Sequence, residues 1–474
     1  MSQIKFGTDG WRGVIGRDFT FANVEVVTQA VADYMESQKP ASRAVLVGYD
    51  CRFMARQFAR RVAEVLAGNG FQAELLDRPF PTPYVSYEAK RRGLAGGVMV
   101  TASHNPPEFC GIKFKAPFGG SATPAIVKEI ESRLHQTAPR IATGAEGVEE
   151  VGPRQEYFDH VKSLVDFGVI QRAKPRVVAD AMHGAARNLL GQILGEFGID
   201  CLTIRDHPDP LFGGVFPEPM EENLGALRTA ILTAKAGIGL ATDGDADRLG
   251  AMDGEGNYVN THQILALLIL HLVRQRGWKG KVVRTVSQSV MIDRICQKLG
   301  LACAIVPIGF KNIADLMLQE DILIGGEESG GVGIKNHIPE RDGILISLLL
   351  LEAFAHSGHS LRQGIEELWK EFGEFHFRRR DLHVPLEFGK NLVQKLRDNP
   401  PARYSGLALQ RVDSLDGTKL VFTDESWILF RQSGTEPLLR IYCEAGSLDQ
   451  VRRMMKEGED LARGNARQEE RQDR

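Results

Sequence analysis

The chain has 474 residues, with 58 basic and 61 acidic side chains and a formal net charge of −3, so its composition gives no bulk argument for binding nucleic acid or a membrane surface. Hydrophobic residues make up 43% of the chain, which allows large buried cores, and the length suggests roughly three or four domains. The 6 cysteines are scattered without a Cys-x-x-Cys pair, which argues against structural zinc and fits reduced thiols.

The sequence carries no sign of a membrane segment. Residues 1–7 lack the apolar core of a signal peptide, and the longest apolar run, 264–273, contains His271 and is far too short to span a bilayer. We therefore expect a soluble, cytoplasmic protein with neither nucleic acid nor a membrane as a partner. The sequence gives no indication of the oligomeric state.

Three segments of the chain repeat one order of elements. Each has an apolar strand candidate, a helix candidate, a glycine that ends the helix and a second strand candidate. This order is the βαβ signature and favours parallel pairing. The segments are 44–47, 56–66, Gly70 and 72–76; then 176–179, 185–196, Gly198 and 201–204; then 282–286, 290–298, Gly300 and 302–306.

A further strand candidate in each segment leads into a polar loop. Ligands of open α/β sheets bind outside the carboxyl ends of the strands. Three such loops could therefore converge on one cleft. The alternative is coincidence, because polar and glycine-rich turns are common between strands and helices. The strand candidates and their loops are 97–100 with 101–106, 238–241 with 242–248, and 322–324 with 325–331.

The last part of the chain breaks this order. Two helix candidates flank short alternating strand candidates, which predicts a smaller α+β domain with an antiparallel sheet. The helix candidates are 388–397 and 447–462, and the strand candidates are 419–422, 427–431 and 440–443. The sequence thus predicts an α/β protein with three related mixed α/β sheet domains and a C-terminal α+β domain. The predicted domains are 1–153, 154–258, 259–370 and 371–474.

The loop that follows residues 238–241 carries Asp243, Asp245 and Asp247 at alternate positions. Three carboxylates this close repel one another, and Mg²⁺ shared with a phosphate is the usual remedy. An EF-hand would need Gly at the sixth position and Glu at the twelfth, where this chain has Arg248 and Gly254. A phosphatase of the Asp-x-Asp-x-Thr type fits less well, because Asp247 takes the Thr position. A solvated acidic turn remains open.

Ser103 lies in Thr-Ala-Ser-His-Asn-Pro, at the end of the first of these further strands. The nucleophile elbow of a hydrolase has the motif Gly-x-Ser-x-Gly, but this chain has Thr101 and Asn105 at the two glycine positions. His104 is adjacent in sequence, which does not by itself place its ring on the serine oxygen. We therefore interpret Ser103 as a hydroxyl that carries a phosphoryl group beside a Mg²⁺ site. The alternative is a turn serine that caps the next element.

The stretch 431–437 is a compact anion nest. Arg431 offers a forked donor, Ser433 and Thr435 offer hydroxyls, and Gly434 lets backbone N–H groups approach a ligand. A phosphate on a small ligand, away from the transferred one, would suit this nest. The alternative is a hairpin turn that contains an arginine by chance.

Four more residues complete the candidate site. Glu327 and Ser329 lie among four glycines and can bind sugar hydroxyls, unless this loop is only a flexible turn. Lys113 could shuttle protons if burial lowers its pKa; otherwise it is a surface cation. Arg12 could hold the phosphoserine or pack against Trp11.

Five motifs in this order resemble the α-D-phosphohexomutase family, and they cover nearly the whole chain. One such loop would be a weak signal, whereas all five with plausible spacing are highly specific. The motifs are Phe-Gly-Thr-Asp-Gly-Trp-Arg-Gly (6–13), Thr-Ala-Ser-His-Asn-Pro (101–106), Asp-Gly-Asp-Ala-Asp-Arg (243–248), Gly-Glu-Glu-Ser-Gly-Gly (326–331) and Arg-Gln-Ser-Gly-Thr-Glu-Pro (431–437).

The resemblance implies four domains around a central cleft and a phosphoserine at Ser103. It implies Mg²⁺ on the three aspartates and a phosphoserine oxygen, and it places Glu327 and Ser329 at sugar-contact positions. The distal phosphate positions match Arg431, Ser433, Gly434 and Thr435. Positions near the transferred phosphate match Lys113, Arg12 and Arg248, with His104 beside the nucleophile, and Lys311 matches a further specificity loop.

Two features bear on the substrate. Some relatives carry His where this chain has Gly331, which favours Lys113 over a histidine at that position as acid or base. We call residues 325–331, the loop predicted to contact sugar, the sugar loop. Its Glu-Glu-Ser form looks more like glucose and mannose mutases than the Glu-Gln-Ser form typical of glucosamine mutases.

The expected function is that of a phosphoglucomutase with hexose 1,6-bisphosphate as intermediate and activator. The alternatives are a phosphomannomutase or dual-specificity enzyme, a metal-dependent sugar phosphatase, and a non-catalytic sugar-phosphate sensor. The intact serine and aspartate loops argue against the sensor.

Overall fold

The structure, a computed structural model, describes residues 4–7, 9–143, 146–433 and 437–472, without the side chains of 464–472. The chain divides into two compact units. The first contains Met1–Val282 and Gly309–Gly364, and the second contains Val283–Ile308 and Ile365–Arg474.

The first sheet of the first unit has the strand order β1-β5-β4-β2-β3-β7, with β6 paired to β5. Strand β2 is parallel to β3 and β4, as the predicted βαβ segment requires, and β5 returns antiparallel to β4. The strands are β1 (Trp11–Val14), β2 (Ala44–Tyr49), β3 (Gln72–Leu76), β4 (Gly96–Val100), β5 (Phe109–Ala116), β6 (Gly120–Ser121) and β7 (Val148–Val151).

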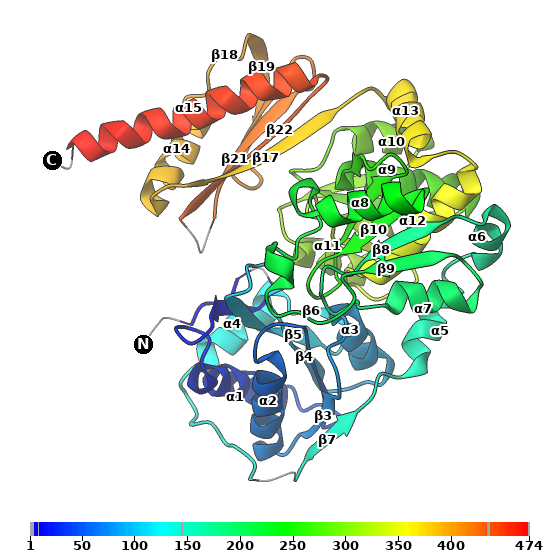
Figure 1. Ribbon diagram of the computed structural model, residues 1–474. Helices are drawn as coiled ribbons and strands as arrows, with labels where there is room; N and C mark the ends of the chain where they lie inside the picture. The colour runs from blue at the N-terminus through cyan, green and yellow to red at the C-terminus, as the bar shows by residue number, and fades with distance from the viewer. Residues whose placement is uncertain (1–3, 8, 144–145, 434–436, 473–474) are drawn as a thin grey trace. The chain divides into compact units, whose positions relative to one another are not determined.

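The same part of the chain forms four helices: α1 (Phe21–Ser37), α2 (Ala55–Gly68), α3 (Thr82–Arg91) and α4 (Pro124–Arg133). In α2, apolar side chains recur with the helical period and are buried against the sheet, while arginines occupy the outer face. Figure 1 shows α1 and α2 side by side, in blue. The N-terminus of α3 points to the second sheet, because the Thr82 N–H donates to the Asp245 carbonyl oxygen at 2.9 Å.

The second sheet has the order β12-β11-β10-β8-β9. Strand β8 is parallel to β9 and β10, and β11 returns antiparallel to β10. The aspartate loop is the turn between β10 and β11. The elements of this region are α5 (Gln155–Ser163), α6 (Phe167–Ala173), β8 (Val177–Asp180), α7 (Leu189–Glu196), β9 (Cys201–Ile204), η1 (Phe212–Gly214), η2 (Glu221–Asn223), α8 (Gly225–Ala234), β10 (Ile238–Thr242), β11 (Leu249–Asp253) and β12 (Tyr258–Val259).

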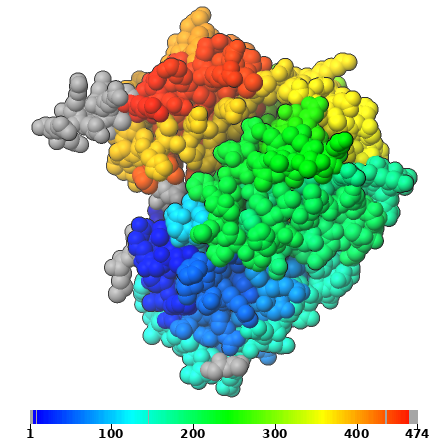
Figure 2. Space-filling view, in the orientation of Figure 1, coloured from blue at the N-terminus to red at the C-terminus, as the bar shows by residue number. Residues whose placement is uncertain are grey.

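A third antiparallel pair, β15 with β16, has the sugar loop as its turn. The elements from here to the C-terminal domain are α9 (Thr261–Leu270), η3 (His271–Gln275), β13 (Lys281–Thr285), α10 (Met291–Leu299), β14 (Cys303–Val306), α11 (Phe310–Gln319), β15 (Ile322–Gly326), β16 (Val332–Ile334), α12 (Gly343–Ser357) and α13 (Leu361–Phe372). Helix α12 is apolar and buried over most of its length. In the space-filling view, the blue and green segments of the first unit adjoin along a continuous surface (Figure 2).

The second unit contains an antiparallel sheet in the order β17-β22-β21-β20-β19-β18. Two helices, α14 and α15, share one apolar core with one face of this sheet (Figure 1). The other face packs around Trp427 and Val286. The elements are β17 (His376–His383), α14 (Leu386–Asp398), β18 (Arg403–Tyr404), β19 (Leu407–Asp413), β20 (Thr418–Phe422), β21 (Trp427–Gln432), β22 (Leu438–Ala445) and α15 (Leu448–Gln472). This arrangement is the α+β domain that the sequence predicts.

Within the described residues, no single helix has both the length and the apolar character needed to cross a membrane; by those two criteria alone, the bent pair of α12 and α13 would pass.

Candidate functional site

Ser103 lies in the connection between β4 and β5, and it is buried. Its φ of 53° is in the left-handed region, which a non-glycine residue seldom adopts. In this conformation the Oγ hydroxyl donates to Oδ2 of Asp243 at 2.7 Å. The Nδ1 atom of His104 lies 3.3 Å from the same Oγ, so the histidine ring does reach the serine oxygen.

The three aspartates of the β10–β11 turn are all buried, and one carboxylate oxygen of each lies within 4.8 Å of the others. Oδ1 of Asp243 accepts from the N–H groups of Asp247 (2.9 Å) and Arg248 (3.1 Å), which fixes the turn. Among the described residues, Oδ1 of Asp245 and Oδ1 of Asp247 have no hydrogen-bond partner. Buried carboxylate oxygens without donors are the ligands that a hard divalent cation takes, so this cluster fits Mg²⁺.

The pKa values of Asp243 and Asp245 are shifted in opposite directions. Burial and the charges of Asp245 and Asp247 raise the pKa of Asp243 well above its usual range. Burial also works against ionisation of Asp245, but the charge and hydrogen bond of Lys113 outweigh it and lower the pKa of Asp245. Thr82 contributes through Oγ1, which donates to Oδ2 of Asp245 at 2.5 Å. The positive charges and hydrogen-bond donors of the protein therefore compensate only part of the negative charge of the three aspartates.

Lys113, on β5, is buried with Nζ 2.8 Å from Asp245, 2.9 Å from Asp9 and 3.1 Å from Asp247. Burial alone would lower the pKa of Lys113, but these three carboxylates raise it above its usual value. The condition under which Lys113 would shuttle protons, a lowered pKa, is thus not met here. The geometry instead makes Lys113 a fixed cation beside the aspartates.

Two arginines lie close to the same loops. Nη1 of Arg12, on β1, donates to Oδ1 of Asn105 at 2.5 Å in the serine loop, and burial lowers the pKa of its guanidinium. Nε of Arg248 lies 3.8 Å from Oδ1 of Asp247, and its Nη1 donates to Glu218 at 3.3 Å. Arg12 therefore adds positive charge beside the serine loop, and Arg248 adds positive charge beside the aspartate turn.

The sugar loop is tied to the aspartate loop by its backbone. The N–H of Leu249 donates to the carbonyl oxygen of Gly330 at 3.1 Å, and Arg248 forms a bridge with Gly331. Burial raises the pKa of Glu327 to about 7, and the nearby charge of Arg341 limits the rise. Ser329 in this loop is only partly buried.

Lys311 lies in the first turn of α11 and is also partly buried. The residue before that helix, Gly309, donates its N–H to Oε1 of Glu327 at 3.1 Å. This bond connects the segment that carries Lys311 to the sugar loop.

Arg341 contacts three of the predicted regions, although no sequence motif indicates it. Its Nη2 contacts Oδ2 of Asp247 and Oδ2 of Asp9 at 2.7 Å each, and its Nη1 lies 3.6 Å from Oε2 of Glu327. It thus joins the aspartate loop, the N-terminal motif and the sugar loop. Asp9 stands inside the motif 6–13 and could have been noticed, whereas Arg341 precedes α12 without any motif around it.

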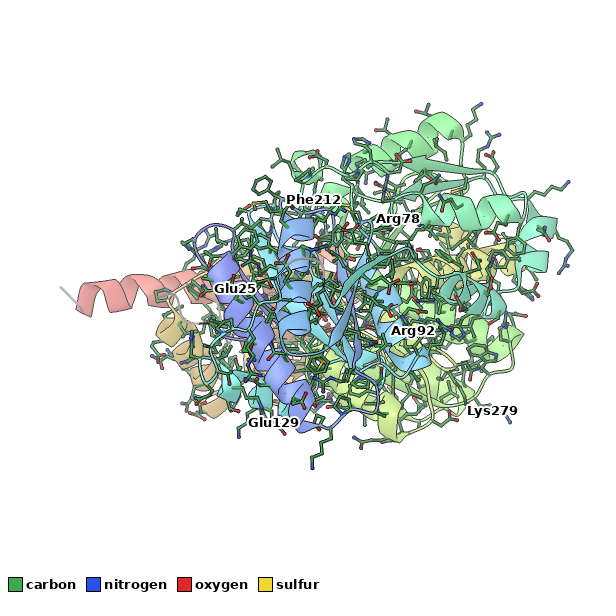
Figure 3. All side chains as sticks on the ribbon, turned by 90° about the horizontal axis from the view of Figure 1, so that it is seen from below. Glu25, Arg78, Arg92, Glu129, Phe212 and Lys279 are labelled. Atoms are coloured by element: carbon green, nitrogen blue, oxygen red, sulfur yellow. The ribbon has the colours of Figure 1, made fainter. Side chains whose placement is uncertain are left out.

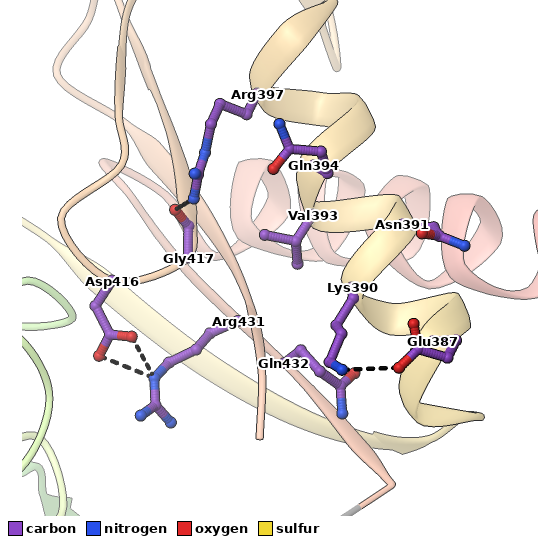
Figure 4. A pocket seen from close by; sticks show the side chains of 10 residues that line it. All are labelled: Glu387, Lys390, Asn391, Val393, Gln394, Arg397, Asp416, Gly417, Arg431 and Gln432. Carbon is purple, nitrogen blue, oxygen red and sulfur yellow. Dashed lines mark hydrogen bonds and ion pairs between the residues drawn. The ribbon is translucent and has the colours of Figure 1, made fainter. Parts of the chain in front are cut away.

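The second unit contains Arg431 and Ser433. Nε of Arg431 lies 2.9 Å from both carboxylate oxygens of Asp416, at the edge of a cavity of about 490 Å³. Figure 4 shows this cavity between α14 and the strand that carries Arg431. Ser433 is buried, and its N–H donates to the Leu438 carbonyl oxygen at 2.8 Å. Gly434 and Thr435, which complete the predicted nest, lie outside the described residues.

The structure thus brings together, in the first unit, the serine, aspartate and sugar loops that the sequence singled out. The backbone and side-chain contacts above link them pairwise: serine to aspartate through Ser103 and Asp243, and aspartate to sugar through Leu249 and Gly330. The predicted residues that share these contacts are Ser103, His104, Lys113, Arg12, Asp243, Asp245, Asp247, Arg248 and Glu327.

Four family models match the chain in order. They are those of the phosphoglucomutase/phosphomannomutase alpha/beta/alpha domains I, II and III, over residues 3–140, 155–256 and 260–372, and of the C-terminal domain of the same family, over residues 398–461.

Individual proteins resemble the chain over nearly its full length. A phosphoglucomutase/phosphomannomutase of Thermococcus kodakarensis is 31% identical, with 96% of this chain and 97% of the relative covered. A protein of Pyrococcus horikoshii named probable phosphoglucosamine mutase is 30% identical, with 97% of each chain covered. The crystal structure of a provisionally named phosphomannomutase from Thermus thermophilus matches with a TM-score of 0.87 and 37% identity, over 98% of this chain and 100% of that one.

The fit of Mg²⁺ to the aspartate turn can be tested by removing one ligand. Asp245→Asn keeps the size of the side chain but removes a charge and one of the oxygens without a hydrogen-bond partner, so we expect Mg²⁺ affinity to fall by about tenfold or more. Isothermal titration of the purified protein with Mg²⁺ measures it. Asp159→Asn, on the exposed face of α5, serves as the control. Equal Mg²⁺ affinity in Asp245→Asn and the wild type would contradict the assignment.

Proposed function

The chain belongs to the phosphoglucomutase/phosphomannomutase family of phosphohexomutase enzymes, and on that premise we propose that it interconverts glucose 1-phosphate and glucose 6-phosphate through a phosphoserine at Ser103. The observation that carries this proposal is the 2.7 Å contact between the Ser103 hydroxyl and the buried aspartate turn. A hydroxyl held against a site for a divalent cation is the arrangement that phosphoryl transfer needs.

In the proposed first step, phosphorylated Ser103 gives its phosphoryl group to the free hydroxyl of a hexose phosphate. The bond between phosphorus and the sugar oxygen forms, the bond between phosphorus and Oγ breaks, and the sugar hydroxyl gives up its proton to a base in the site. The product is a hexose 1,6-bisphosphate. After this intermediate turns around, Oγ takes the other phosphoryl group and the sugar hydroxyl regains a proton. The same bisphosphate would act as the activator, because it phosphorylates Ser103.

The charged residues around Ser103 have separate proposed roles. His104 would exchange a proton with the leaving serine oxygen, and the 3.3 Å distance between its Nδ1 and Oγ supports this role. Lys113, Arg12 and Arg248 would hold the negative charge of the transferring group. Mg²⁺, when bound on the three aspartates and a phosphoserine oxygen, would neutralise part of that charge.

The remaining predicted residues would hold the sugar and its second phosphate. We propose that Glu327 and Ser329 bind sugar hydroxyls, with Lys311 as an additional contact. Arg431, Ser433, Gly434 and Thr435 would bind the phosphate that is not being transferred. The pairing of Arg431 with Asp416 supports this role, since it fixes Nε and directs the guanidinium.

The identity of the sugar is the least constrained part of the proposal. The Glu-Glu-Ser sequence of the sugar loop supports glucose or mannose, whereas relatives of about the same similarity include proteins named probable phosphoglucosamine mutase. Domains 1–153, 154–258, 259–370 and 371–474 and a cytoplasmic location stay predictions.

Replacing the nucleophile tests the proposal directly. We expect Ser103→Ala to lower mutase turnover at least about 1,000-fold while the fold is retained, because the change removes the hydroxyl that contacts Asp243. A coupled assay with Mg²⁺ and a trace of bisphosphate, run with glucose, mannose and glucosamine 1-phosphates, measures it and ranks the sugars. Ser132→Ala, at the surface of α4, is the matched control. Free phosphate released without isomerised sugar would instead indicate a phosphatase.

The buried carboxyl of Glu327 predicts a pH dependence. With its pKa raised to about 7, this group is protonated below that pH and accepts hydrogen bonds from sugar hydroxyls fully only above it. Affinity for hexose 1-phosphate should therefore rise between about pH 6 and pH 8. Glu327→Gln removes this titration, while ionisation of the ligand's own phosphate affects both proteins equally. Parallel pH profiles of Kd in the two proteins would contradict the role of Glu327.

A further inference from the structure

Arg52 lies in the turn that follows β2, and its side chain is fully buried. Its guanidinium contacts five acceptors at once. Nε lies 3.1 Å from Oδ2 of Asp50, and the two terminal nitrogens donate to four backbone carbonyl oxygens of the serine loop. Those carbonyls belong to Ser103 (2.7 Å), Asn105 (2.7 Å), Pro106 (2.8 Å) and Phe109 (2.9 Å).

Asp50, the ion-pair partner of Arg52, also contacts the serine loop. Its Oδ2 accepts from the hydroxyl of Thr101 at 2.6 Å, and that hydroxyl accepts from the N–H of Ser103 at 2.8 Å. The N–H of Ser103 is therefore held through Thr101 and Asp50, and the carbonyl of Ser103 is held by Arg52 directly. Both peptide groups that flank the Ser103 side chain are thus fixed by one buried ion pair.

The turn 50–52 is also closed off from water. The ring of Phe212 lies over the guanidinium, with its centroid 5.0 Å from Cζ of Arg52, and it is itself buried. Phe212, labelled in Figure 3, lies in η1, between β9 and β10 of the sheet that carries the aspartate turn. Gly244 in that turn approaches so closely that a Cβ there would meet the Ser103 carbonyl oxygen at 2.5 Å. Arg52 therefore works in a dry, tightly packed setting, where charge-assisted hydrogen bonds are strong.

The left-handed φ of Ser103 explains why such a hold is needed. A serine in this conformation is strained relative to an extended one and persists only where its surroundings determine it. Without the guanidinium, four carbonyls would lose its hydrogen bonds, although that of Pro106 would keep the N–H of Phe109 at 3.1 Å, and the loop could relax toward a conformation in which Oγ no longer reaches Asp243. A displacement of the reacting atom by about 1 Å can cost roughly 100-fold in rate.

From these contacts we infer that Arg52 is a positioning residue for phosphoryl transfer, which sets the conformation of Ser103 and the aim of its Oγ without touching the substrate. The inference rests on the proposed role of Ser103 as the nucleophile. It differs from a purely structural role for the buried ion pair, because it ties Arg52 to the rate of transfer and not to the affinity for sugar phosphate.

The test compares Arg52→Ala, Arg52→Lys and Arg56→Ala. Arg56, on the exposed face of α2, pairs with Glu150 at the surface and serves as the control. Each protein is mixed with glucose 1,6-bisphosphate and Mg²⁺ in a single turnover, and intact-mass spectrometry follows phosphorylation of Ser103. Calorimetry gives the Kd for glucose 1-phosphate, and circular dichroism reports folding.

We expect Arg52→Ala to slow transfer by about 100-fold with little change in Kd, because the loop and not the sugar site is disturbed. Millimolar guanidinium chloride should restore part of the rate in Arg52→Ala, since the free ion can occupy the vacated space, and sodium chloride should not. Arg52→Lys keeps the charge beside Asp50 but has too few donors in the right plane, so it should fold and remain slow.

Several results would overturn the inference: a folded Arg52→Ala with the wild-type transfer rate, equal losses of rate and affinity, no rescue by guanidinium, or wild-type transfer in Arg52→Lys. If neither variant folds, Arg52 serves the fold and the inference is likewise overturned. If the wild-type protein gains no phosphoryl group at Ser103, the proposed function itself fails, which separates that outcome from the others.

Discussion

Three carboxylates buried at one turn must be balanced by positive charge, and the first unit is arranged around that demand. Lys113 and Arg341 contact these carboxylates, and Asp9 in turn contacts both cations. Even so, Oδ1 of Asp245 and Oδ1 of Asp247 remain without hydrogen-bond donors among the described residues. The uncompensated part of the charge is the reason why we propose a cation site at this turn, and the hydroxyl of Ser103 is held against the turn.

The fold supplies this arrangement through three antiparallel returns. In the first two segments, a strand that pairs in parallel with its neighbour, β4 with β2 and β10 with β8, is followed by a strand running back beside it, and β15 is likewise followed by the antiparallel strand β16. In all three, the connection between the antiparallel strands carries predicted site residues. A connection between two paired strands has both ends fixed by the sheet, which limits its conformations. That rigidity suits a site where Ser103 must keep an unfavourable backbone conformation.

Much of the fold could be read from the sequence because the βαβ segments have clear apolar strands and amphipathic helices. Strand β17 was not predicted, since its sequence, His-Phe-Arg-Arg-Arg-Asp-Leu-His, is too charged to look like a strand. It is an edge strand of the second unit, where charged side chains are tolerated and discourage pairing with other chains.

The sequence indicates the site residues that lie in local motifs, but not those whose place depends on distant contacts. The loops of Ser103 and Asp243 have local motifs, so their chemistry could be read directly. The place of Arg341 could not, because its contacts are with residues far away along the chain. Lys113 shows the same limit in its electrostatics: the sequence indicates a lysine close to a phosphate site, but only the three surrounding carboxylates decide that its pKa is raised.

The place at which a divalent cation binds can be observed directly. A crystal structure of the protein soaked with Mn²⁺ in place of Mg²⁺, with anomalous scattering recorded, would locate the ion. We expect one strong peak in contact with carboxylate oxygens of Asp243, Asp245 and Asp247 and on the side facing Ser103. Full Mn²⁺ occupancy at another place, with the aspartate turn vacant, would contradict the proposed cation site.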